Sequence, residues 1–75
     1  MILPSKHIPE HRALLGLGAI ILNHINTPRT ISALWEKVRI HQSIGTYERY
    51  ILTLDMLYML GVIRSNMGLI EKVEI

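Results

Sequence analysis

Residues 46–73 read TYERYILTLDMLYMLGVIRSNMGLIEKV and are the most informative stretch for the fold. Thr46 is a good N-cap residue, because its side-chain oxygen can accept a hydrogen bond from a free N–H group of the first helical turn. Gly61 can adopt the left-handed conformation that closes a helix. We therefore expect a helix that begins at Thr46 and ends at Leu60.

Two short runs that favour β-structure follow this helix, at residues 62–65 and 69–73. Asn66, Met67 and Gly68 separate them. Gly68 suits the left-handed position of a three-residue loop, so the runs predict a β-hairpin.

We expect two more helices before residue 46. Residues 10–25 and 31–40 repeat apolar side chains at the helical period, and Thr30 is a suitable N-cap for the second helix. The chain breaks between them at Pro28, because a residue before proline avoids the helical region. The expected apolar positions are Leu14, Leu17, Ile21 and Ile25 in the first helix and Ile31, Leu34, Trp35 and Val38 in the second.

Residues 1–9 cannot form a helix across Pro4 and Pro9, and we expect a short edge strand and an extended arm there. The order is then strand, helix, helix, turn, helix and hairpin. This order is typical of a winged helix-turn-helix, a mostly helical α+β fold, and we expect residues 1–75 to form a single domain of this kind.

The composition predicts a partner. Of 75 residues, 49% are hydrophobic, and twelve Ile and eleven Leu make up nearly a third of the chain. The mean hydropathy is +0.29, and no cysteine is present to form a disulfide. A domain this small cannot bury so much apolar surface alone.

Several protein classes are excluded. The longest apolar run, Ala13 to Leu22, is too short for a membrane span, which needs about 18 residues. The N-terminus lacks the features of a signal peptide, so we expect a cytoplasmic protein. The net charge is +2, but the basic residues are spread out and form no polybasic tail.

The expected helix 46–60 decides between DNA and protein as the partner. Its predicted core face holds Tyr47, Tyr50, Ile51, Leu54, Leu57 and Tyr58, while the other side carries Thr53 and an apolar stripe of Leu52, Met56 and Met59. Helices that read DNA offer basic and amide side chains, whereas this one has one Arg against two carboxylates. The stripe suits a protein groove; the alternative is that it packs inside the domain.

The helix expected at 10–25 is apolar around most of its circumference. We assign Leu17 and Ile21 to the core, and Leu15 and Leu22 to a second contact surface. Gly16 and Gly18 reduce helix propensity, which is tolerable where another backbone must come close.

The alternative function is DNA binding, as a winged-helix transcription regulator or as a DNA-contacting subunit, because the third helix of this fold commonly enters the major groove. The candidate contacts are Lys37, Arg39, Arg49 and Arg64. The expected hairpin tip carries no Lys or Arg, which disfavours this alternative.

The sequence holds no recognisable catalytic or cofactor motif. It contains no phosphate-binding loop, no nucleophile elbow and no H-E-x-x-H motif. Pro9 separates His7 from His11, and His24 and His41 are isolated along the chain. We therefore expect no enzyme activity, cofactor, metal or small-molecule substrate.

Four stretches resemble the ABC-three-component system middle component 6 family. They are MILPSKHI at 1–8, RALLG at 12–16, PRTISALWEKVR at 28–39 and LDMLYMLG at 54–61. The first is the most specific, whereas the third and the fourth resemble many winged helices. The chain departs at Ala33, where relatives often carry a Glu that completes the cap.

The resemblance implies a component of a bacterial defence system similar to Lamassu. Such systems pair an SMC-like coiled-coil ATPase with an effector, often a nuclease, encoded in the same operon. The small middle protein is then expected to be a non-catalytic adaptor between them. An antitoxin-like inhibitor is a third hypothesis, and a homodimer is an alternative assembly.

Overall fold

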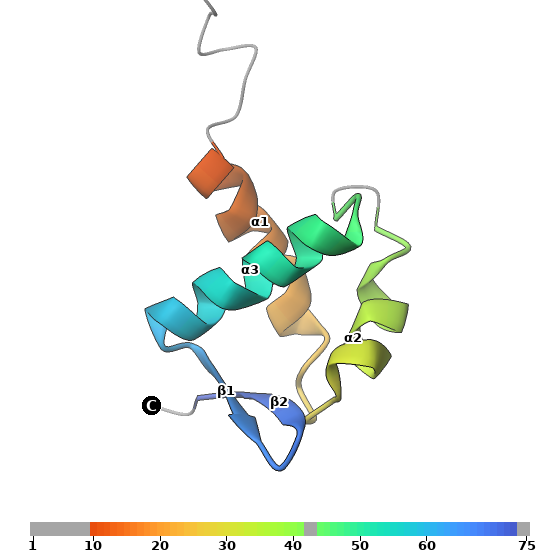
Figure 1. The fold of residues 1–75 in the computed structure, drawn as a ribbon, viewed down its shortest axis with the longest axis vertical. Coiled ribbons are helices and arrows are strands. Elements are labelled where there is room, and N and C mark those ends of the chain that lie inside the picture. Colours follow the sequence, from red (N-terminus) through yellow and green to blue (C-terminus); the bar gives the residue numbers. More distant parts are fainter. Residues whose placement is uncertain (1–9, 42–43, 74–75) are drawn as a thin grey trace, which may run out of the picture.

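Three helices precede a two-stranded antiparallel hairpin in the computed structural model, which describes residues 10–41 and 44–73 (Figure 1). The elements are α1 (Glu10–Asn23), α2 (Ile31–Val38), α3 (Tyr47–Leu60), β1 (Ile63–Asn66) and β2 (Leu69–Lys72). This mostly helical α+β arrangement is consistent with a winged-helix fold, as expected. The edge strand expected within residues 1–9 lies outside the described residues.

Local hydrogen bonds set three of the helix ends as the sequence predicts. The Thr30 Oγ1 atom accepts from Ala33 N at 3.0 Å, and the Thr46 Oγ1 atom accepts from Arg49 N at 3.1 Å. Gly61 closes α3 in the left-handed conformation, with φ of 77°. Both predicted N-caps and the predicted C-terminal glycine are therefore confirmed.

Helices α1 and α2 each end two residues before the expected position. After Asn23, the N–H groups of His24 and Ile25 donate to carbonyls three residues back, so the chain tightens and leaves the α-helix before Ile25. The second helix ends at Val38 rather than Ile40.

Within the described residues, no helix is both long and apolar enough to cross a membrane.

The hairpin turn is shorter than expected. Asn66 pairs with Leu69, so Met67 and Gly68 alone form the loop. Both have positive φ, 53° and 81°. A two-residue type I′ turn requires positive φ at both central positions, because this twist matches that of the flanking strands. The predicted three-residue loop is therefore wrong.

A third segment joins the hairpin from the connection between α1 and α2. Arg29 and Ile70 exchange two backbone hydrogen bonds, of 3.1 Å and 2.6 Å, and form an isolated antiparallel bridge. The hairpin is therefore tied to the helical part through its second strand.

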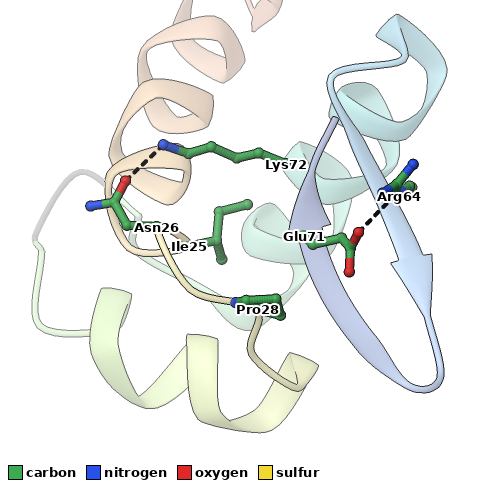
Figure 2. A pocket seen from close by; sticks show the side chains of 6 residues that line it. All are labelled: Ile25, Asn26, Pro28, Arg64, Glu71 and Lys72. Carbon is green, nitrogen blue, oxygen red and sulfur yellow. Dashed lines mark hydrogen bonds and ion pairs between the residues drawn. The ribbon is translucent and has the colours of Figure 1, made fainter. Parts of the chain in front are cut away.

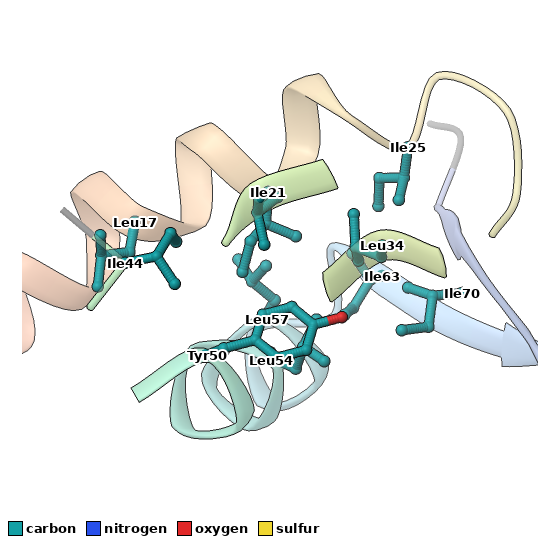
Figure 3. Close-up of a cluster of buried hydrophobic side chains, with 11 residues drawn as sticks. Leu17, Ile21, Ile25, Leu34, Ile44, Tyr50, Leu54, Leu57, Ile63 and Ile70 are labelled. Carbon is teal, nitrogen blue, oxygen red and sulfur yellow. The ribbon is translucent and has the colours of Figure 1, made fainter. Parts of the chain in front are cut away.

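One hydrophobic core lies between the three helices and the hairpin (Figure 3). Tyr50 reaches across it, and its hydroxyl donates to the Ile31 carbonyl at 2.7 Å. All three helices, both strands and the turn before α3 contribute buried side chains to this core. The buried hydrophobic residues are Leu17, Ile21, Ile25, Leu34, Val38, Ile44, Tyr50, Leu54, Leu57, Ile63 and Ile70.

Three side chains differ from the burial that the sequence predicts. Thr53 is buried, and its hydroxyl donates to the Arg49 carbonyl at 2.7 Å, so the buried hydroxyl has a hydrogen-bond partner without water. Tyr47 is exposed rather than in the core, and its ring packs edge-on against Trp35 with centroids 5.1 Å apart. Ile31, at the start of α2, is also exposed.

Candidate protein-interaction surface

The apolar stripe of α3 is divided between surface and core. Leu52 and Met59 are 53% and 86% exposed. Met56, between them, is half-buried and packs against the core. The stripe therefore offers two exposed apolar side chains, one on either side of a methionine that the domain itself partly covers.

The two predicted contact residues of α1 divide in the same way. Leu15 is 51% exposed, whereas Leu22 is half-buried and packs against the core. Leu17 and Ile21 are buried, as predicted. The sequence could not separate Leu15 from Leu22, because both lie on the same side of the helix, and only the neighbouring elements distinguish them.

The five predicted contact residues of α1 and α3 surround the place where these two helices cross. Figure 1 shows α3 passing across α1. Gly18 lies at this contact, because a Cβ atom built on it would meet Leu57 and Met56 of α3. A Cβ atom built on Gly18 would be 3.5 Å from Met56 Cε. Leu15 and Leu22 lie one turn to either side of Gly18, and Leu52 and Met59 lie one turn to either side of Met56. We call Leu15, Leu22, Leu52, Met56 and Met59 the crossing surface.

The exposed charged side chains on this side of α3 are carboxylates, whereas Arg49, on the same side, is half-buried. Asp55 lies between Leu52 and Met59 on the helix and is exposed, as is Glu48 in the first turn. A surface with exposed apolar side chains and carboxylates is complementary to an apolar site flanked by basic residues.

The four candidate DNA contacts lie on three different elements. Arg39 and Arg64 are engaged with carboxylates, Arg39 with Glu36 at 3.0 Å and Arg64 with Glu71 at 2.8 Å. Lys37 is exposed in the last turn of α2, and Arg49 is half-buried in the first turn of α3. Two of the four positive charges are thus already compensated within the protein.

A groove of about 260 Å³ separates the end of α1 from the hairpin (Figure 2). Across it, Lys72 Nζ donates to Asn26 Oδ1 at 2.8 Å, and the Arg64–Glu71 ion pair lies on the hairpin side. Each charged side chain that lines the groove is bonded to another lining residue, so we assign the groove a structural role. It is lined by Ile25, Asn26, Pro28, Arg64, Glu71 and Lys72.

The structure brings His24 and His41 together, although the sequence shows them as isolated. Their Nε2 atoms are 3.3 Å apart. Within the described part of the chain, no group of three or more His, Cys, Asp or Glu side chains comes together to hold a metal. The pair could not be found from the sequence, since 17 positions separate the two residues.

A sequence model of the ABC-three component system middle component 6 matches residues 3–73. The chain belongs to this family. The resemblance carried by the four sequence stretches is thereby confirmed, and the family name implies a role alongside the other components of such a system. No curated protein and no solved structure matches the chain.

Proposed function

We propose that this middle component is a non-catalytic winged-helix adaptor. It bridges an SMC-like coiled-coil ATPase and an effector protein, encoded in the same operon, in a bacterial defence complex directed against phages or plasmids. The proposal places the protein in the cytoplasm. Family membership supports a role in the three-component system, and the crossing surface supports protein contact as the form of that role.

The exposed side of α3 is the observation that carries this proposal. A winged helix that reads DNA presents the corresponding helix to the major groove, where base edges call for hydrogen-bonding side chains and phosphates call for positive charge. Here that side presents Leu52 and Met59 together with Asp55. Burying these apolar side chains in a protein groove is favourable, whereas placing Asp55 beside phosphates is not.

The same features describe the partner's side of the contact. Met59 is unbranched and flexible, so it can fit an irregular apolar pocket. The carboxylate of Asp55 favours a basic residue at the rim of that pocket. We therefore propose that the ATPase offers an apolar groove with basic residues beside it, and that the crossing surface docks there.

The test is co-purification of the protein with the ATPase encoded beside it. The double variant Leu52→Glu, Met59→Glu changes two exposed positions and leaves Met56, which packs against the core, in place. We expect the affinity for the ATPase to fall at least about thirtyfold, the effect of losing a hot-spot residue. Circular dichroism of the free variant checks that it remains folded.

Met67→Glu is the matched control, because Met67 is 95% exposed at the hairpin tip, away from α3. This variant should bind the ATPase like the original protein. The proposal fails if the double variant binds equally well, or if both variants lose binding to the same degree.

A further inference from the structure

Two histidine rings from different elements face each other at the ends of two helices. His24 directly follows α1, and His41 follows α2. Both side chains are half-buried, their Nε2 atoms are 3.3 Å apart, and their ring centroids are 5.5 Å apart. The two nitrogens are therefore the parts of the rings that approach each other most closely.

This separation matches that of two ligands on one metal ion. Zinc binds imidazole nitrogen at about 2.0–2.1 Å, and two nitrogens at the tetrahedral angle are then about 3.3–3.4 Å apart. Without a metal, the contact is a hydrogen bond when one of the two Nε2 atoms is the N–H donor and the other is the acceptor. A divalent ion can take the place of this hydrogen bond when each ring turns so that its nitrogen lone pair is directed at the ion.

The surrounding backbone favours a positive charge at this position. The carboxyl ends of α1 and α2 both lie beside the pair, and the C-terminus of a helix carries a partial negative charge. Arg29 is a nearby cation, but its Nε donates to the main-chain carbonyl of His24 at 2.7 Å and is directed at the backbone. The electrostatics at the helix ends therefore act in the same direction as the ligand geometry.

We propose that His24 and His41 together bind a divalent transition-metal ion, with zinc as the best match. Imidazole nitrogen suits zinc, copper and nickel, whereas magnesium and calcium prefer oxygen. Two protein ligands leave coordination positions open, and water fills them in the isolated chain. The bound ion links the end of α1 to the end of α2. This inference is independent of the proposed adaptor function.

Titration calorimetry of the full chain with zinc chloride, after removal of metals by a chelator, tests the proposal. We expect one zinc ion to bind per chain and magnesium chloride to give no signal. His24→Gln and His41→Gln should each weaken zinc binding at least about tenfold, since changes even to groups behind the ligands cause such losses. Zinc should also raise the melting temperature of the original protein and not that of these variants.

His7→Gln, His11→Gln is the matched control, because it removes the other two histidines of the chain. This double variant should bind zinc like the original protein. If only this variant loses binding, or if the original protein binds no zinc, the proposal is wrong and the histidine contact is a ring-to-ring hydrogen bond only.

A measurement on the unaltered protein covers the case in which a variant does not fold. Nitrogen-15 spectra of the histidine rings should show zinc-dependent shifts at the Nε2 atoms of His24 and His41. Shifts confined to His7 and His11 would overturn the proposal.

Discussion

Gly18 of α1 lies directly against Leu57 of α3. A Cβ atom built on Gly18 would be only 3.0 Å from Leu57 Cδ2, closer than such contacts normally come. The absence of a side chain at Gly18 therefore lets the two helices cross closely and brings Met56 to α1. Gly16, one residue from Leu15, has nothing within 4 Å of the corresponding position.

The first prediction concerns this crossing. Gly18→Val adds a branched side chain where Leu57 Cδ2 must shift to make room, and overpacking of this kind costs about 1–3 kcal/mol. We expect the free energy of unfolding to fall by this amount in urea denaturation. Gly16→Val is the control, because the same change at an open position should alter stability by no more than about 0.5 kcal/mol. Equal effects at the two positions would contradict the close crossing.

The second prediction concerns alkaline pH. Burial, followed by the neighbouring Tyr47 and Tyr58, raises the pKa of Tyr50 well above its ordinary value of about 10. The unfolded chain therefore loses this proton at a lower pH than the folded protein. The Tyr50 contribution to stability is fully present below pH 10 and decreases above it, by up to about 1.4 kcal/mol per pH unit.

The variant Tyr50→Phe separates the contribution of Tyr50 to the alkaline loss of stability from the contributions of other groups. It removes the hydrogen bond to the Ile31 carbonyl and should lower stability at pH 7 by about 0.5–1.5 kcal/mol. Its alkaline decline should be weaker than that of the original protein, while Tyr47→Phe should retain the decline. Urea unfolding at several pH values between 9 and about 11 measures both, in the range where tyrosine titrates. An unchanged decline in Tyr50→Phe would assign the effect to other groups.

The third prediction concerns the hairpin turn. Met67 has a φ of 53°, a left-handed conformation that costs an ordinary side chain about 1–2 kcal/mol. Asn tolerates this conformation and favours type I′ turns before glycine. Met67→Asn should therefore raise the melting temperature, with a stability gain of about 0.5–1 kcal/mol. In the helix α3, Met59→Asn should instead lower it, because Asn is a poorer helix former.

The fourth prediction concerns DNA. Arg39 and Arg64 are paired with carboxylates, and the outer side of α3 carries Asp55. Duplex DNA should bind no more tightly than the non-specific range of about 10⁻⁴–10⁻⁶ M, and Arg49→Ala should leave this weak binding unchanged. Tight, salt-dependent binding that is lost in Arg49→Ala would instead support the DNA-binding alternative. Fluorescence anisotropy with labelled duplexes at two salt concentrations distinguishes these outcomes.

Much of the helical framework can be predicted from local chemistry. Thr30 and Thr46 cap their helices through a hydroxyl that reaches an N–H group three residues ahead, and this depends only on neighbouring residues. Gly61 closes α3 for an equally local reason. The turn at Met67 was harder to predict, because two- and three-residue loops both place Gly68 in the left-handed region, and strand register decides between them.

The candidate interaction surface was only partly visible from the sequence. A helical wheel groups Leu52, Met56 and Met59 on one side of the helix, and it places Thr53 there too. It cannot show that α1 passes over Met56, or that Thr53 is buried with its hydroxyl bonded to the Arg49 carbonyl. Burial at the edge of a helical face depends on where the neighbouring helix crosses it.

Periodicity, composition and short-range hydrogen bonding specify the three helices, the hairpin, the helix caps and the surplus of apolar side chains, so these can be predicted from the sequence. Which distant groups meet depends on the tertiary structure. It placed Gly18 against Leu57, left Leu52 and Met59 exposed, and brought His24 to within 3.3 Å of His41. These contacts depend on how the helices cross and where their ends converge in space, which spacing along the chain does not specify.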